Sequence, residues 1–159
     1  MELKKVTMIR QVYDLEMSEL KYLQKLGAGQ FGSVYLAYSD GKDQFFALKS
    51  CQKDKILKEN LQKYIFQEKA VLEELDFPFI MKFYKTFKDK HRLYFLIEFI
   101  KGKEVFDAIR EIGILDSDIS RFYIATILLC LEYMHSKMIV YRDLKPENMM
   151  VDEEVNYLS

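Results

Sequence analysis

Three polar residues within six positions, Asp143, Lys145 and Asn148, have side chains that suit phosphoryl transfer. An aspartate can orient and deprotonate a hydroxyl, a lysine can neutralise a transferring phosphoryl group, and an asparagine offers a carbonyl oxygen to a metal ion. Phosphoryl transfer depends mainly on this kind of positioning and charge neutralisation. Because a random loop seldom supplies all three groups at this spacing, we expect residues 139–151 to carry groups for phosphoryl transfer.

A glycine-rich stretch near the N-terminus, residues 27–32, has the spacing G-x-G-x-x-G. In a dinucleotide-binding site a helix must begin at the last glycine. Residues 33–38 instead have the residue types of a strand and are followed by a hairpin turn, so the reading as a dinucleotide-dependent oxidoreductase fails. The glycines therefore predict a strand–turn–strand flap, whose backbone N–H groups can approach phosphates closely because glycine has no Cβ. Taken alone, the pattern also fits a plain glycine-rich hairpin.

Lys49 ends an apolar strand, and Glu68 lies 19 positions further on, in a segment with helical spacing of apolar residues. A lysine beside buried positions requires an anionic partner. An ion pair between the two residues would hold the ammonium group as a fixed cation for a phosphate. Spacing alone does not distinguish this pair from a surface lysine and a solvated glutamate.

The secondary-structure elements that must position these residues are mainly strands before Gly102 and mainly helices after it. Residues 22–26, 33–38, 45–49, 81–87 and 93–100 are strand-like, with turns at 39–43 and 88–92. Between them, residues 60–75 predict a helix that Pro78 prevents from continuing. After Gly102 we expect helices at 104–112 and 117–136, then short strands at 149–151 and 155–158. The second helix is apolar on nearly every face, so we expect it to lie in the middle of a core.

Composition limits the class of protein. The 159 residues include 24 Lys and Arg and 25 Asp and Glu, for a net charge of −1. The absence of a basic excess gives no support for a nucleic-acid partner. Two cysteines, Cys51 and Cys130, exclude a disulfide scaffold and a cysteine-rich zinc site, and we expect two free buried thiols.

No segment of the sequence predicts a membrane span or a secretory signal. The most apolar stretch, residues 122–131, is ten residues long, whereas a membrane helix needs about 20. Arg10 interrupts the apolar stretch near the N-terminus, so we find no signal peptide there. The cytoplasm is therefore the expected location.

Taken together, these motifs resemble a eukaryotic protein kinase from about residue 20 to residue 159. Tyr141 replaces the histidine usual at the start of the catalytic loop, and residues 78–89 and 102–106 are also similar to the AGC group, especially to its cyclic-nucleotide-dependent members. The form Asp-Leu-Lys-Pro-Glu-Asn at 143–148 is that of serine/threonine kinases. The resemblance implies an α+β fold with a five-stranded antiparallel N-lobe sheet, one main helix and the start of a helical C-lobe.

The resemblance also implies roles for individual residues, with ATP and Mg²⁺ as cofactors. Asp143 would be the catalytic base, Lys145 would contact the γ-phosphate, and Asn148 would bind magnesium. Ile97 would guard the back of the adenine pocket, Glu98 to Ile100 would hydrogen-bond adenine, and Glu104 would lie near the ribose. The remaining residues expected to bind the nucleotide are Leu26, Gly27, Ala28, Gly29, Gln30, Phe31, Gly32, Ser33, Val34, Ala47, Lys49 and Glu68.

The resemblance also divides the chain into an N-terminal extension (1–19), an N-lobe with hinge (20–100) and a partial C-lobe (101–159). The Asp-Phe-Gly motif of the family would fall just past Ser159, so we expect a kinase fragment with little activity by itself. The alternative is an inactive nucleotide- or partner-binding fragment. Glu104 and Glu147 predict protein substrates with basic residues near the Ser or Thr, and a separate regulatory subunit remains open as a partner.

Overall fold

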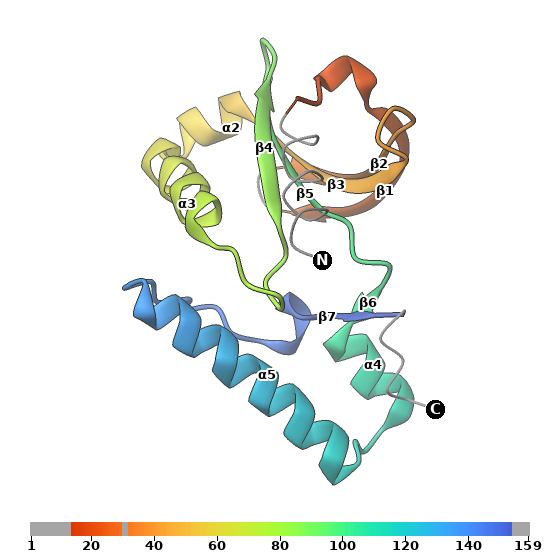
Figure 1. Ribbon diagram of the computed structural model, residues 1–159. Helices are drawn as coiled ribbons and strands as arrows, with labels where there is room; N and C mark the ends of the chain where they lie inside the picture. Colours follow the sequence, from red (N-terminus) through yellow and green to blue (C-terminus); the bar gives the residue numbers. More distant parts are fainter. Residues whose placement is uncertain (1–13, 30–31, 154–159) are drawn as a thin grey trace. The chain divides into compact units, whose positions relative to one another are not determined.

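The computed structural model describes residues 14–29 and 32–153, which form two compact units. The first unit includes residues up to Leu75 together with Lys82–Phe99. The second comprises Asp76–Met81 and the chain from Ile100 onward. Figure 1 shows the elements of each unit along the chain. The strand expected at 155–158 lies outside the described residues.

The first unit is built on a five-stranded antiparallel sheet with the order β1-β2-β3-β5-β4. The strands are β1 (Lys21–Gly29), β2 (Gly32–Ser39), β3 (Gln44–Gln52), β4 (Phe83–Lys88) and β5 (Arg92–Glu98). β3 and β5 are the most buried, in keeping with the aromatic and aliphatic residues that they carry. The predicted five-stranded sheet is confirmed.

Two helices accompany this sheet, α2 (Lys53–Lys58) and α3 (Gln62–Glu74). α3 is the main helix predicted from the periodicity, and it ends before Pro78 as expected. α2 was not predicted, because six residues are too few to show a helical period. In Figure 1, α3 lies beside β4, and the two elements are in contact.

The core of the first unit has two clusters of buried side chains. One cluster includes Phe46, Leu48 and Leu96 and also encloses Leu15, which is 0% exposed. Leu15 precedes the short 3₁₀ turn η1 (Met17–Glu19), and its carbonyl accepts a hydrogen bond from Lys85 Nζ at 2.7 Å. The second cluster joins Phe95 of β5 to Ile65 of α3, and it anchors the helix against the strands.

The second unit contains a two-stranded sheet, β6 (Gly102–Glu104) paired with β7 (Met150–Asp152). A Cβ placed on Gly102 would lie 1.8 Å from the Val151 carbonyl oxygen, so glycine is needed for the two strands to approach. The helices of this unit are α4 (Val105–Ile112), α5 (Ser117–Ser136) and the 3₁₀ turn η2 (Pro146–Asn148).

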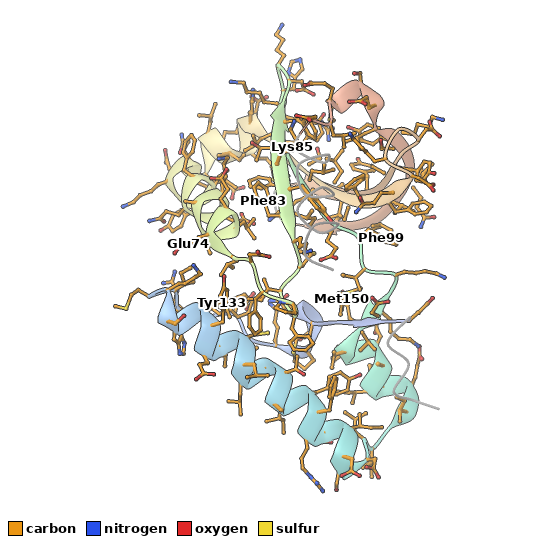
Figure 2. All side chains as sticks on the ribbon, in the orientation of Figure 1. Glu74, Phe83, Lys85, Phe99, Tyr133 and Met150 are labelled. Atoms are coloured by element: carbon orange, nitrogen blue, oxygen red, sulfur yellow. The ribbon has the colours of Figure 1, made fainter. Side chains whose placement is uncertain are left out.

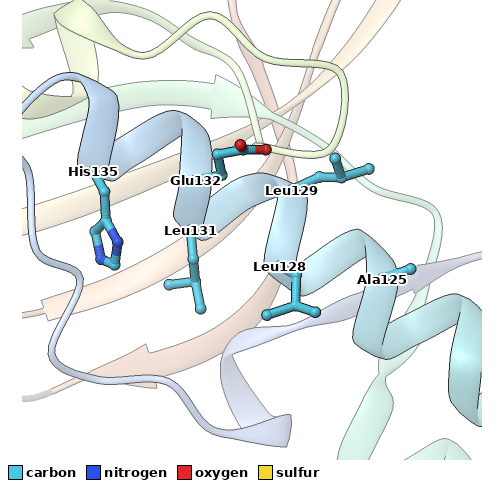
Figure 3. Close-up of a pocket in the computed structure, with 6 residues that line it drawn as sticks. All are labelled: Ala125, Leu128, Leu129, Leu131, Glu132 and His135. Atoms are coloured by element: carbon cyan, nitrogen blue, oxygen red, sulfur yellow. The ribbon is translucent and has the colours of Figure 1, made fainter.

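Helix α5 does not have the buried environment that its composition predicts. Among its described residues only Met134 is buried, whereas Ile124 is 57% exposed and Leu128 is 59% exposed. A shallow groove runs along the helix, lined by Ala125, Leu128, Leu129, Leu131, Glu132 and His135. Figure 3 shows Leu128, Leu131 and His135 projecting from one side of the helix and Glu132 from the other. The described part of the chain therefore leaves Ile124, Leu128 and Leu129 largely uncovered.

Two further expectations concern membranes and thiols. Within residues 14–29 and 32–153, no helix is both long and apolar enough to cross a bilayer. Both cysteines are free, but only Cys51 is buried, whereas Cys130 on α5 is partly exposed. The expectation of two buried thiols is thus correct for Cys51 and wrong for Cys130.

Candidate active site

The glycine-rich stretch lies at the paired ends of β1 and β2, as predicted for a strand–turn–strand flap. Gly27 pairs with Val34 and Ala28 with Ser33 across the two strands. A Cβ placed on Gly27 or Gly29 would meet no other atom within 4 Å. These two glycines leave free space beside the backbone, which is the condition for a phosphate to approach it. Gln30 and Phe31, which were also expected to bind the nucleotide, lie outside the described residues.

Lys49 and Glu68 form the ion pair that the sequence predicts. Lys49 Nζ lies 2.5 Å from Glu68 Oε1, and the two side chains are 34% and 39% exposed. The ammonium group also lies 5.7 Å from the centroid of the Phe95 ring on the neighbouring strand. Phe95 was not identified from the sequence, because its contact depends on the register between β3 and β5, in which Lys49 faces Phe95.

The residues expected around adenine lie close to one another along two paired strands. Ala47 of β3 pairs with Ile97 of β5, and Val34 of β2 pairs with Lys49 on the other side of β3. At the end of β5, Glu98 makes two hydrogen bonds with Lys82. Glu98 N–H donates to the Lys82 carbonyl at 2.8 Å, and Lys82 N–H donates to Glu98 Oε2 at 3.0 Å. Leu26 on β1 is 41% exposed.

In the second unit, Asn148 and Lys145 hold Asp143 from opposite sides of its carboxylate. Asn148 Nδ2 donates at 2.8 Å to Asp143 Oδ2 and also at 2.8 Å to the Asp143 main-chain carbonyl. Lys145 Nζ lies 3.1 Å from Asp143 Oδ1. The three residues proposed from spacing alone are thus brought together in one hydrogen-bonded group.

These contacts change the acidity of Asp143. The hydrogen bond from Asn148, followed by that from Lys145, lowers the pKa of Asp143 below its ordinary value. The carboxylate is 65% exposed, and its partial desolvation acts to raise the pKa, so the lowering comes from the direct hydrogen bonds. Asp143 is therefore ionised at neutral pH and can accept a hydrogen bond from a hydroxyl group.

The backbone around Asp143 is shaped by its neighbours in sequence. Arg142, directly before it, has φ 63°, in the left-handed region that non-glycine residues seldom adopt. After it, η2 turns the chain at Pro146 and leads into β7. The pairing of β7 with β6 fixes the far end of the loop. The sequence marked the loop as lying between an apolar run and a strand, but it did not reveal the partner strand at residues 102–104.

Glu104 and Glu147 are carried by elements that pack together within the second unit. Glu104 ends β6 and occupies the N-cap position of α4, and α4 contacts η2, which contains Glu147. The Glu104 side chain makes no capping hydrogen bond among the described residues. Val105 N–H donates to the Met149 carbonyl at 2.8 Å, which ties the start of α4 to the residue after η2.

The oxygen ligands available near Asp143 suit a hard cation. Because Asn148 uses its amide nitrogen to bind Asp143, its Oδ1 is the atom that could coordinate a metal ion. No three His, Cys, Asp or Glu side chains come together as a metal cluster in residues 14–29 and 32–153. Magnesium fits such a site, since it takes one or two protein ligands and completes its shell with water and substrate phosphates.

Comparison with known proteins agrees with this geometry. The protein kinase domain family matches residues 20–158. Over 140 residues the chain is 42% identical to the cGMP-dependent protein kinase of Plasmodium berghei (strain Anka), a match that covers 88% of this chain and 16% of that protein. It is 39% identical over 140 residues to the cGMP-dependent protein kinase of Toxoplasma gondii, covering 88% of this chain and 14% of that protein.

A second group of relatives is similar over the same region. The chain is 41% identical over 138 residues to the human 3-phosphoinositide-dependent protein kinase 1, covering 87% of this chain and 25% of that protein. The chain thus spans about one sixth of the cGMP-dependent relative from Plasmodium berghei and one quarter of the human relative.

Proposed function

Because the chain belongs to the protein kinase domain family, we propose that it carries part of the catalytic domain of an ATP-dependent protein serine/threonine kinase. The observation that carries the proposal is the group formed by Asp143, Lys145 and Asn148. It combines an ionised carboxylate, a nearby cation and a free amide oxygen within one loop. The relatives are named as protein kinases, which agrees with this chemistry.

In this proposal the first unit binds the nucleotide. The backbone at Gly27 and Gly29 approaches the phosphates, and Lys49, held by Glu68, supplies a fixed positive charge to them. Ala47 and Ile97 bound the adenine site, and the backbone of residues 98–100 hydrogen-bonds the base. Glu98 N–H already donates to the Lys82 carbonyl, so the Glu98 carbonyl is the backbone group of this residue that can hydrogen-bond the base. This hydrogen bond supports the proposed arrangement.

The second unit supplies the groups for phosphoryl transfer. Asp143 orients the acceptor hydroxyl and takes its proton as the new oxygen–phosphorus bond forms, and ADP leaves. Lys145 neutralises negative charge on the transferring phosphoryl group. Asn148 would hold Mg²⁺ through Oδ1, and this cation would supply neutralisation of charge on the phosphate oxygens. Asn148 at the same time keeps the Asp143 carboxylate in place through its amide hydrogens.

We further propose Ser and Thr as the acceptors and a preference for basic residues beside them. The sequence Asp-Leu-Lys-Pro-Glu-Asn at 143–148 supports the first point. The preference for basic residues is supported by Glu104 and Glu147, which lie on elements that contact each other. Within the described residues, the Glu104 side chain makes no capping hydrogen bond. Carboxylates placed together can bind a guanidinium group through paired hydrogen bonds. Glu104 could also contact the ribose, as the resemblance implies.

The test uses the intact protein that contains this chain, with ATP, Mg²⁺ and peptide libraries whose acceptors are Ser, Thr or Tyr. We expect transfer to Ser and Thr peptides, and its loss in Asp143→Asn. Calorimetric titration with ATP and Mg²⁺ gives a second readout that does not depend on transfer. If ATP binds and no peptide is phosphorylated, the protein is a nucleotide-binding module and the kinase proposal is wrong.

A further inference from the structure

Leu15 lies before β1, in the stretch that the resemblance to protein kinases treats as an extension outside the N-lobe, yet it is completely buried. It belongs to the first cluster of core residues, together with side chains from three strands of the sheet. These are Ala37 of β2, Phe46 and Leu48 of β3, and Tyr94 and Leu96 of β5. A residue from outside the sheet therefore completes the core on one face of the sheet.

The backbone around Leu15 is held by hydrogen bonds. Lys85 of β4, labelled in Figure 2, donates from Nζ to the Leu15 carbonyl at 2.7 Å and so joins residues 70 positions apart. Directly after Leu15, the Glu16 N–H donates to Glu19 Oε2 at 2.6 Å, which closes the turn η1. Met17 of this turn packs against the same cluster. The position of Leu15 is thus fixed from both its carbonyl and the turn that follows it.

Leu15 lies on the face of the sheet opposite to the one that carries Lys49. Leu48 and Leu96, which share the cluster with Leu15, are directly paired across β3 and β5. Successive side chains of a strand point to opposite faces, so the next pair along the two strands, Lys49 and Phe95, lies on the other face. In that pair the ammonium group lies 5.7 Å from the centroid of the Phe95 ring. Leu15 is therefore connected to Lys49 through two neighbouring strands at once.

The packing of the core makes this connection sensitive to volume. Protein interiors are close-packed, so a void beside Leu48 and Leu96 is partly filled by movement of the strands that carry them. Since Lys49 is bonded to Leu48, β3 cannot move at this point without carrying Lys49 with it. The 2.5 Å contact between Lys49 Nζ and Glu68 Oε1 depends on that position.

We propose that Leu15 is a positioning residue for Lys49: by filling the core behind the Leu48–Leu96 pair, it holds the Lys49–Phe95 pair in place on the opposite face. This inference rests on the proposed function, in which Lys49 supplies a positive charge to the phosphates of ATP. Leu15 meets neither the nucleotide nor the substrate, because it lies on the other face of the sheet. Its effect on the nucleotide is transmitted through Lys49.

The experiment compares the binding of ATP with Mg²⁺ and of adenosine by calorimetry, in the intact protein with and without Leu15→Ala. Adenosine has no phosphates, so its affinity reports the apolar contacts of Ala47 and Ile97, which depend less on direction than a charge contact does. We expect Leu15→Ala to weaken ATP binding by roughly three- to tenfold and adenosine binding by less than about twofold. Leu15→Met keeps most of the volume and should restore the affinity for ATP.

Leu20→Ala is the matched control for loss of core volume. Leu20 is a buried leucine of the same cluster, but it directly precedes β1, which pairs with β2 and not with β3. Leu20→Ala should lower the thermal midpoint as Leu15→Ala does, and it should leave the ratio of ATP affinity to adenosine affinity unchanged. If Leu15→Ala does not fold, Lys85→Gln provides the same comparison, because it removes the donor to the Leu15 carbonyl without opening the core.

A double mutation tests whether the effect passes through Lys49. In a Lys49→Met background the cation is absent, so Leu15→Ala should no longer change the ratio of the two affinities. Its effect on the thermal midpoint should be the same in both backgrounds. Equal weakening of ATP and adenosine by Leu15→Ala overturns the inference. An equal change of the ratio in Leu20→Ala, or an undiminished change in the absence of Lys49, also overturns it.

The outcomes also separate this inference from the proposed function. If the unmutated protein does not bind ATP, the proposed function is wrong and the inference is wrong with it. If ATP binds and no peptide is phosphorylated, the kinase proposal is wrong, whereas the role of Leu15 is still decided by the two affinities. If ATP binds and Leu15→Ala leaves their ratio unchanged, only the role of Leu15 is wrong.

Discussion

Gly32 and Ser50 approach each other so closely that no side chain fits between them. A Cβ on Gly32 would lie 1.7 Å from the Ser50 carbonyl oxygen and 2.8 Å from its carbonyl carbon. The two residues belong to paired strands, with Gly32 facing Cys51 and Ser33 facing Ser50. The third glycine of the pattern is therefore required by strand packing, whereas Gly27 and Gly29 are free of any such contact.

This difference predicts opposite effects of two alanine substitutions. Gly32→Ala should lower the free energy of unfolding by about 1–3 kcal/mol, because a methyl group must displace backbone. Gly29→Ala should fold normally, yet it should weaken ATP binding by roughly tenfold, or about 1.4 kcal/mol, because the methyl group would obstruct a phosphate. Denaturant unfolding and calorimetric ATP titration measure the two effects. Normal ATP affinity in Gly29→Ala would contradict the proposed phosphate contact.

Lys49→Arg should not preserve activity, although it keeps the positive charge. The guanidinium group is planar and branched, whereas the pair with Glu68 at 2.5 Å is built around a compact ammonium group. We expect kcat to fall by about ten- to hundredfold, which corresponds to roughly 1.4–2.7 kcal/mol of transition-state stabilisation. The matched control is Lys63→Arg, an exposed lysine on the same unit. Steady-state kinetics that find both variants fully active would show that Lys49 is not the phosphate contact.

The acidity of Asp143 can be measured directly. Asn148 and Lys145 lower its pKa, so the carboxylate remains ionised as the pH falls past the ordinary pKa of an aspartate. Any stabilisation that these contacts contribute is present above that ordinary pKa and is lost as the pH falls through the lowered one. Asn148→Ala removes the larger contribution and should raise the pKa of Asp143. Carbon-13 NMR titration of the Asp143 carboxyl group in both proteins measures the change, and an unchanged pKa would contradict the assignment.

Substrate preference provides a further prediction. Glu147→Gln should reduce selection for Arg or Lys near the acceptor by about tenfold, because it removes one carboxylate that can bind a guanidinium group. ATP affinity should remain nearly unchanged. Glu111→Gln is a matched control, since Glu111 lies in the same unit and pairs with Lys103. The measurement is turnover of a peptide library by the intact protein, and equal use of acidic and basic peptides before mutation would rule the preference out.

The individual strands and α3 could be predicted because their signals are local, whereas the five-stranded antiparallel arrangement was implied by the resemblance to protein kinases. Turn residues separate the strands, and α3 carries apolar residues at helical spacing over a length sufficient to show it. The catalytic loop was also predictable, because Asp143, Lys145 and Asn148 are close in sequence as well as in space. The ion pair between Lys49 and Glu68 was harder to predict, because it depends on how α3 packs against the sheet.

The features that were missed depend on contacts between distant parts of the chain. The three-residue strand β6 is stable only as the partner of β7 and has no recognisable pattern of its own, whereas the strand expected at 149–151 is found as β7. The contact of Phe95 with Lys49 follows from strand register, which composition does not fix. The exposure of Leu128 could not be predicted, because periodicity shows that a helix is apolar but not which residues cover it.

The packing of Phe77 on Tyr133 also affects the order in which the protein can fold as it is made. The hydrogen bond from Asp76 to Tyr133 joins residues 57 positions apart. A ribosome adds about 5–20 residues per second, so Tyr133 is synthesised roughly 3–11 s after Asp76. The elements on both sides of Asp76–Met81, α3 and β4, are complete before that time. During the interval the Phe77 ring lacks the partner on which it stacks, so this contact forms only after the neighbouring elements have been synthesised.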